Sequence, residues 1–229
     1  QKEKPSDFVF GSGWDQNDWE NKAFPTKAKL DSLFPDIPVA LQRIDGHALL
    51  VNQKALDLAK IDNTTITEGG EVIQEGGEVT GVLIDNAMDL VYNVMPKLSR
   101  EQSIQALKDA QDYCFDYGLT TVNDAGLDRN TILLIDSLQK AGTLEMRMYA
   151  MISNTAADVD YFIENGILKT EKLNVRSVKV YGDGALGSRG AALRAPYSDR
   201  HNHYGAMVTP VDSIYSLAKK LAKTDFQMN

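Results

Sequence analysis

The chain has 229 residues, and 43% of them are hydrophobic, a share that suits a folded protein with a buried core. Its 24 Lys and Arg against 32 Asp and Glu give a formal net charge of −8, which argues against nucleic acid or an anionic membrane as a partner. A single cysteine, Cys114, excludes an internal disulfide and a zinc site built from several cysteines. No apolar run approaches the roughly 20 residues of a membrane span. No signal peptide is visible, and cytoplasmic and periplasmic locations both stay open.

Residues 1–96 predict a small α+β domain. Strands are expected at residues 8–14 and 37–44, and a short helix at 52–60. The stretch EVIQEGGEVTGVLID predicts a hairpin that turns at Gly76–Gly77. Short mixed strands joined by glycine-rich turns indicate an insertion that lies over one end of a larger domain.

From residue 97 onward, strands alternate with helices. Ser99 is suited to cap a helix over residues 100–117, and Asn130 is expected to cap the next one. Strands are predicted at LTTVNDAG, LEMRMYAMI and NVRSVKVYGDG, and another begins at residues 226–229. Such alternation is typical of βαβ units with a parallel sheet. Because a complete (β/α)8 TIM barrel has about eight strands, residues 97–229 predict a partial barrel. The predicted fold class is α/β, with an N-terminal α+β insertion.

The strand VRSVKVYGDG carries a lysine among valines. Alternation along a strand places Val178 and Val180 on one face, and Lys179 with Asp183 on the other. The outer face of a barrel packs on helices and is apolar, so Lys179 is expected to point inward. A buried lysine can lose its charge and then act as a base, form a Schiff base, or add CO₂ to give a metal-binding carbamate. The plainer alternative is that Lys179 reaches the rim or pairs with Asp183.

The loop that follows, GDGALGSRG, formally matches the glycine fingerprint of dinucleotide-binding proteins. That fingerprint should open a helix, whereas Arg189, Gly190 and Pro196 interrupt any long helix here. The glycines are therefore interpreted as loop geometry rather than as a nucleotide site.

The chain has three histidines. His201 and His203 form an H-x-H, but SDRHNHYG is typical of a loop, which favours an incidental surface pair. His47, in RIDGHALLVN, follows a predicted strand with Asp45 and Gly46 at the turn. It is either a structural histidine or a polar group held over a pocket.

Several segments together resemble the metal-dependent amidohydrolases of the type that includes the N-substituted formamide deformylases. The similar segments are GWDQNDW, RIDGHALLVNQKAL, GEVTGVLIDNAMDLV, LTTVNDAG and VKVYGDGALGSRGAAL. They follow the family's order across nearly the whole chain, and the last is the most specific. By this resemblance the chain is identified as an internal fragment of such an enzyme.

The resemblance implies hydrolysis of an amide-type C–N bond in a small molecule by water activated on one or two divalent ions, with zinc as the expected metal. If the strands are numbers two to five, Lys179 falls on strand four, where the family has a carboxylated bridging lysine. Lys179 is thus implied as a catalytic residue and metal ligand. His47 is implied as a catalytic group that binds substrate or polarises its carbonyl. Further substrate contacts are implied for Trp14, Asp45, Asp183 and Arg189.

The family's other metal ligands have no counterpart in this sequence: an H-x-H on the first strand, histidines on the fifth and sixth, and an aspartate on the eighth. The chain alone is therefore expected to hold no catalytic metal pair and to be inactive. Two alternatives stay open. One is a catalytically dead binding module that keeps the pocket of the insertion, and the other is a Schiff-base lyase that uses Lys179. Unpaired barrel edges also predict a homo-oligomer, unless the insertion covers the opening.

Overall fold

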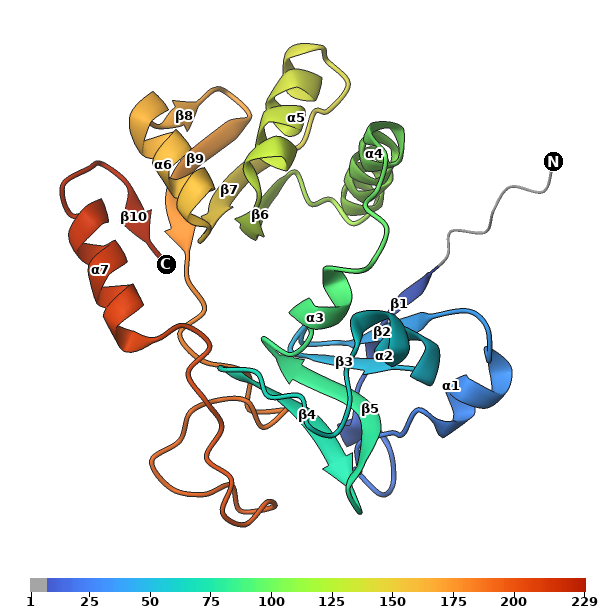
Figure 1. The fold of residues 1–229 in the computed structure, drawn as a ribbon. Coiled ribbons are helices and arrows are strands. Elements are labelled where there is room, and N and C mark those ends of the chain that lie inside the picture. The colour runs from blue at the N-terminus through green and yellow to red at the C-terminus, as the bar shows by residue number, and fades with distance from the viewer. Residues whose placement is uncertain (1–7) are drawn as a thin grey trace. The chain divides into compact units, whose positions relative to one another are not determined.

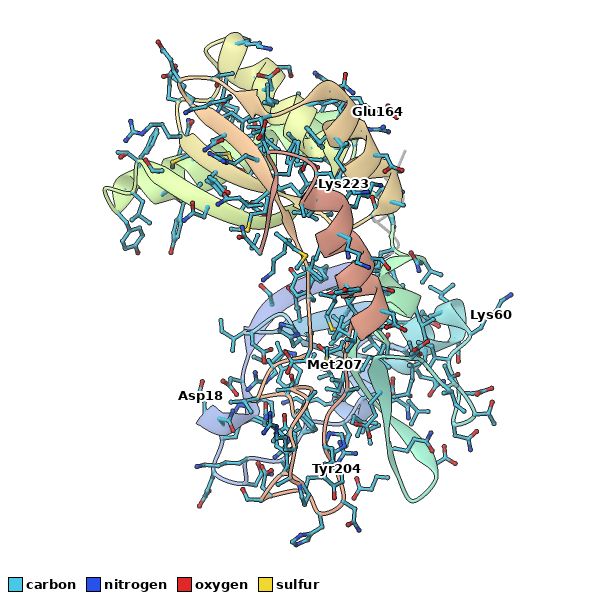
Figure 2. The ribbon with its side chains drawn as sticks, turned by 90° about the vertical axis from the view of Figure 1, so that its left-hand side faces the viewer. Asp18, Lys60, Glu164, Tyr204, Met207 and Lys223 are labelled. Atoms are coloured by element: carbon cyan, nitrogen blue, oxygen red, sulfur yellow. The ribbon has the colours of Figure 1, made fainter. Side chains whose placement is uncertain are left out.

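The computed structural model describes residues 8–229, which form two compact units (Figure 1). The mixed-sheet unit combines the described part of Gln1–Lys97 with Tyr181–Pro210. The parallel-sheet unit combines Leu98–Val180 with Val211–Asn229. The side chains of both units are drawn in Figure 2.

The segment 181–210 belongs to the mixed-sheet unit, whereas the sequence pattern assigned it to the domain at 97–229. Its polar groups find their partners there. Arg200 forms an ion pair with Glu71, and Gln16 donates a hydrogen bond from Nε2 to the carbonyl of Gly187 at 3.0 Å. Contacts between residues so far apart in the chain leave no local pattern, so the division of the chain differs from the prediction at this loop.

The mixed-sheet unit is built on five strands. They are β1 (Val9–Trp14), β2 (Val39–Arg43), β3 (Ala48–Val51), β4 (Gly70–Glu75) and β5 (Glu78–Asp85). Their order is β1-β2-β3-β5-β4, with β1 parallel to β2 and the other pairs antiparallel. The short helices are η1 (Gln16–Asp18), α1 (Ala28–Leu33), α2 (Gln53–Ala59) and α3 (Asp89–Tyr92). The β4–β5 hairpin turns at Gly76 and Gly77, which both have positive φ, as the sequence predicts.

Both faces of this sheet are covered. Leu49 and Leu83 belong to one buried cluster, which includes residues of α2 and α3. Leu50 and Val82, one position along each strand, belong to a second cluster that packs against Trp14. Successive side chains of β3 and β5 thus pack into two small cores on opposite faces of the sheet. This packing fixes the positions of the polar residues at the strand ends.

The parallel-sheet unit alternates strands and helices. Its strands are β6 (Thr121–Leu127), β7 (Arg147–Ser153), β8 (Leu168–Lys169), β9 (Leu173–Lys179) and β10 (Gln227–Met228). Its helices are α4 (Arg100–Asp116), α5 (Arg129–Lys140), α6 (Ala156–Asn165) and α7 (Val211–Leu221). The main path β6-β7-β9-β10 is parallel throughout, and β8 pairs antiparallel with β9. No helix within residues 8–229 is long and apolar enough to cross a membrane.

Of the two capping residues expected in this unit, one is observed and the other differs. Ser99 forms a reciprocal capping box with Gln102 at the start of α4. The cap of α5 is Asp128 rather than the expected Asn130, because the Asp128 carboxylate accepts the backbone N–H groups of Asn130 and Thr131.

One side of the parallel sheet packs against the helices. A single cluster joins Ile132 and Ile135 of α5, Phe162 of α6 and Leu221 of α7 to the strand residues Ala150, Ile152, Val175 and Val178. Val175 and Val178 are an odd number of positions apart, which strict alternation would put on opposite faces. A register shift in β9, between Asn174 and Ser177, brings both to the same side.

The opposite face of the parallel sheet is polar. Ser177 lies beside Met151, and Lys179 beside Ser153, one position off the residues of the cluster. Side chains bond across the strands on this face, since Asn229 Nδ2 donates to Ser177 Oγ at 3.0 Å and Tyr149 donates to Gln227 Oε1 at 3.0 Å. Lys179 therefore ends β9 on the face opposite to Val178, as alternation predicts.

The carboxyl group of Asp124 makes the stability of this unit depend on pH. It pairs with Ala150 and shares the covered side with Val122. Burial raises the pKa of its carboxyl above the usual range. Burial disfavours the charged form in the folded state, so the stability of the unit falls as the pH rises through the folded-state pKa. We expect Asp124→Asn to raise the Tm by a few degrees at neutral pH and to leave it unchanged at about pH 2.5, below the ordinary pKa of aspartate. Thermal melts at both pH values measure this, and an equal gain in acid would contradict it.

Candidate functional site

A histidine–aspartate pair lies where two strands of the mixed-sheet unit end. His47 is in the turn between β2 and β3, and Asp85 is the last residue of β5. Pairing of Ala48 with Ile84 brings the two side chains together. His47 Nδ1 lies 2.6 Å from Asp85 Oδ1, and the Asp85 side chain is only 4% exposed. A carboxylate of this kind fixes the orientation of an imidazole ring and the position of its proton.

Two glycines of the GDGALGSRG loop enclose the Asp85 carboxylate. A Cβ atom at Gly184 or at Gly190 would lie 2.1 Å from Asp85 Oδ2, far inside contact distance. Neither glycine has positive φ, so the requirement here is space and not backbone conformation. Gly184 and Gly190 thus allow the loop to approach Asp85 closely.

A buried arginine, which the sequence analysis did not single out, joins three acceptors beside this pair. The Arg43 side chain is 2% exposed. Its Nη2 lies 2.5 Å from Asp15, its Nη1 2.5 Å from Asp45, and its Nε donates to Gln16 Oε1 at 2.8 Å. Asp45 Oδ1 in turn accepts the backbone N–H of His47 at 3.1 Å. The Arg43 network therefore reaches the catalytic candidate His47 through Asp45.

Within the network, electrostatics favour the charged form of Asp15. The pKa of Asp15 is held below its usual value, first by the hydrogen bond from the backbone N–H of Asn17 and then, against the effect of burial, by the charge of Arg43. The guanidinium itself lies against the backbone of Gly187, where an added Cβ would meet both Nη atoms at 2.9 Å.

A pocket of about 430 Å³ opens beside His47 within the mixed-sheet unit. The residues that line it are Gln42, Asp45, Gly46, His47, Asp85, Asn86, Met88, Asp89, Tyr92, Tyr181 and Val208. Burial raises the pKa values of both Asp89 and Tyr92, although the hydrogen bond from Gln42 opposes this at Tyr92. With three carboxyl groups and one imidazole, the walls suit a neutral or cationic ligand that donates hydrogen bonds.

The other proposed substrate residues have structural partners outside this pocket. Trp14 donates from Nε1 to the carbonyl of Leu41 at 2.7 Å. Asp183 accepts the backbone N–H of Ala192 at 2.9 Å, and Arg189 bonds to Asp199 at 2.7 Å. Of the residues proposed for substrate, the pocket therefore brings together Asp45 and His47, and substrate contacts of Trp14, Asp183 and Arg189 stay predictions.

The H-x-H pair does not act as one unit. His201 is exposed. His203 donates from Nε2 to the carbonyl of Arg189 at 2.7 Å, and its Nδ1 lies 4.0 Å from Glu71. His203 thus fastens its loop to the mixed-sheet unit.

Lys179 is half-buried at the carboxyl end of β9. The β7 residues on the same face, Ser153 beside Lys179 and Met151 beside Ser177, offer neither carboxylates nor imidazoles. Within residues 8–229, no group of three His, Cys, Asp or Glu side chains could hold a metal ion. This donor set does not by itself fit a metal centre, and no reaction step through a metal follows from it.

The fold is similar to that of two solved structures. It matches an uncharacterized metal-dependent hydrolase from Pyrococcus horikoshii OT3 with a TM-score of 0.65 and 24% identity, over 96% of this chain and 44% of that one. A second such hydrolase, from Pyrococcus furiosus, matches with a TM-score of 0.62 and 24% identity, over 97% of this chain and 45% of that one. At this identity the likeness supports the fold, a mixed α/β architecture with a parallel sheet.

The sequence identifies the family. The profile of the Amidohydrolase family matches residues 1–229, and the chain belongs to that family. It is 33% identical to YtcJ of Bacillus subtilis (strain 168), named as an amidohydrolase, over 94% of this chain. It is 29% identical to the protein LONG AFTER FAR-RED 3 of Arabidopsis thaliana over 100% of this chain. The chain spans 42% and 41% of these two relatives. The resemblance to amidohydrolases is thus confirmed.

Proposed function

We propose that this chain forms part of a metal-dependent hydrolase that cleaves an amide-type C–N bond in a small molecule. Membership of the amidohydrolase family over the whole chain carries the proposal. We also propose that the parallel sheet is about strands two to five of a (β/α)8 barrel. Its strands follow one another in chain order, and its helices contribute to a cluster on one side. A doubly wound sheet carries helices on both faces, whereas a barrel carries them only outside.

Lys179 is the residue we propose as a carboxylated metal ligand. It ends β9 at the carboxyl edge of the parallel sheet, on the face opposite to the helix-packed cluster, and barrel enzymes place their chemistry at that edge. In its neutral form the Lys179 amine can bond to the carbon of CO₂ and release a proton, which gives a carbamate with oxygen donors. A divalent metal such as zinc, if it were held by this carbamate, would supply Lewis-acid activation of water. The further ligands would come from outside the described residues.

His47 and Asp45 are proposed as substrate-binding residues. Both line the pocket of about 430 Å³. The Arg43 network and Asp85 hold them in place, so that their polar atoms need little rearrangement when a ligand binds.

A second candidate, a binding module without catalysis, is favoured by one observation. The pocket is complete within the mixed-sheet unit, so it could hold a ligand without any metal. Metal content and turnover separate the two candidates, as follows.

The 229-residue chain alone is expected to bind no stoichiometric zinc and to hydrolyse no N-substituted formamide. The longest natural polypeptide that contains this sequence is expected to bind zinc and to hydrolyse the formamide. Atomic absorption and release of formate measure the two properties. Tight zinc with turnover in the short chain, or neither property in the long polypeptide with zinc and bicarbonate supplied, would overturn the proposal. The second outcome would favour the binding module.

In the long polypeptide, Lys179→Met is expected to lower metal content and to reduce kcat/KM at least about 100-fold, since it removes a metal ligand. Carbon-13 bicarbonate should give a carbamate resonance in the unmodified protein that this variant lacks. Lys223→Met, at an exposed lysine of the same unit, is the matched control and should change neither. A carbamate signal that survives Lys179→Met would contradict the assignment.

A further inference from the structure

His47 is held at two points, one on its ring and one on its backbone. Asp85 Oδ1 lies 2.6 Å from its Nδ1, and Asp45 Oδ1 accepts its backbone N–H at 3.1 Å. The Asp85 carboxylate is itself fixed, because its side chain is 4% exposed and Gly184 and Gly190 lie against Oδ2. The ring therefore has little freedom to rotate away from its acceptor.

The backbone conformation at residue 85 suits an aspartate. Its φ is +48°, a conformation that most residues with a Cβ avoid. Aspartate and asparagine tolerate it better than other side chains, and glycine adopts it without cost. A residue held in this conformation, with its side chain aimed at an imidazole in a pocket, points to a role in positioning.

We propose that Asp85 is the positioning residue of His47, and that it keeps the ring proton on Nδ1 so that the neutral imidazole presents Nε2 as an acceptor. An ionised carboxylate can only accept hydrogen bonds, so with Asp85 in that form the short contact requires N–H at Nδ1. A hydrogen bond between Nε2 and a ligand would then be one that the ring accepts.

This assignment decides which of the two suggested roles His47 fills. To polarise a carbonyl, Nε2 must carry a proton, which in this arrangement requires the doubly protonated ring. The neutral ring instead accepts a hydrogen bond from an N–H or O–H group of the ligand. The walls around it, with the carboxyl groups of Asp45 and Asp89, also favour donors. The inference rests on the proposed function for the identity of the ligand as an amide, but the position of the proton can be tested without any turnover.

The test is nitrogen-15 NMR of the imidazole groups in the 229-residue chain, in alkaline buffer where neutral rings predominate. The chain has only three histidines, so a His47→Gln variant assigns the signals of His47. We expect a single tautomer, with the proton on Nδ1 and an unprotonated Nε2. Asp85→Asn, which suits the same backbone conformation, should produce a mixture of tautomers, because an amide can either accept or donate. Asp36→Asn, at an exposed aspartate of the same unit, removes the same charge and should leave the spectrum unchanged.

The unmodified protein decides the matter even if Asp85→Asn fails to fold. A proton on Nε2, or a mixture of tautomers, would overturn the proposal, as would an Asp85→Asn spectrum identical to that of the unmodified chain. Loss of hydrolase activity in the long polypeptide with the tautomer as expected would count against the proposed function and leave the role of Asp85 standing. In an active long polypeptide, Asp85→Asn should lower kcat more than it changes KM, since the ring remains but is misaligned.

Discussion

Replacing Arg43 with methionine is expected to lower the free energy of unfolding of the mixed-sheet unit by about 3 kcal/mol. The side chain is 2% exposed and serves Asp15, Asp45 and Gln16 together. Methionine fills a similar volume but leaves these groups without their donor, and an unpaired partner of a buried charge is costly. Arg43→Lys should recover little of the loss, because a single ammonium cannot reproduce the planar fork.

Tryptophan fluorescence during urea unfolding measures this effect in the right part of the molecule. The chain has two tryptophans, Trp14 and Trp19, and both belong to the mixed-sheet unit. Arg194→Met, at an exposed arginine of the same unit, makes the same chemical change and should cost little. If Arg43→Met and Arg194→Met have equal midpoints, the Arg43 network does not stabilise the unit.

The second large effect is expected at Gly184. In Gly184→Ala the new methyl group would lie 2.1 Å from Asp85 Oδ2 and 2.8 Å from the carbonyl carbon of Gly190. Neither neighbour can move freely, because the carboxylate is held by His47 and the other atom is backbone. We expect a loss of about 2–3 kcal/mol in the same fluorescence assay, at the upper end of what overpacking costs.

Two further variants establish the cause of that loss. Gly182→Ala lies in the same loop, where a Cβ meets nothing within 4 Å, and should be close to neutral. Asp85→Ala removes the atom that clashes, so the double variant with Gly184→Ala should be destabilised by at least about 1 kcal/mol less than the sum of the single changes. Additive losses would show that the Asp85 carboxylate is not what Gly184 makes room for.

Much of the fold could be predicted because it is encoded locally. The hairpin at Gly76–Gly77 and the capping box at Ser99 rest on neighbouring residues, and simple alternation was enough to place Lys179 opposite Val178. The shift in β9 was not predictable in this way, because an extra residue in a strand leaves no mark on its composition. Its effect falls on Leu173 and Val175, ahead of the lysine.

The site was predicted only in part, for a related reason. Asp45 and His47 are close in sequence and could be recognised at a predicted turn. Asp85 and Arg43 contact residues that are distant in the sequence, namely His47 and Asp15. One signal for Arg43 was available: an arginine ends the strand VALQR, two residues before Asp45. A charge at the end of a buried strand with an acid beside it predicts a buried ion pair, although its second acid, Asp15, could not be named.

The mixed-sheet unit is built from two separate stretches of the chain, and this affects the order in which its parts can fold during synthesis. The five strands of its sheet are complete once residue 85 has been made, but the glycines that enclose Asp85 arrive only after the strands β6, β7 and β9. During synthesis, the carboxylate that orients His47 is therefore open to water until residues 181–210 leave the ribosome and dock. The pocket acquires its final walls late, and a ribosome-bound chain that stops before residue 181 would carry the histidine without its fixed setting.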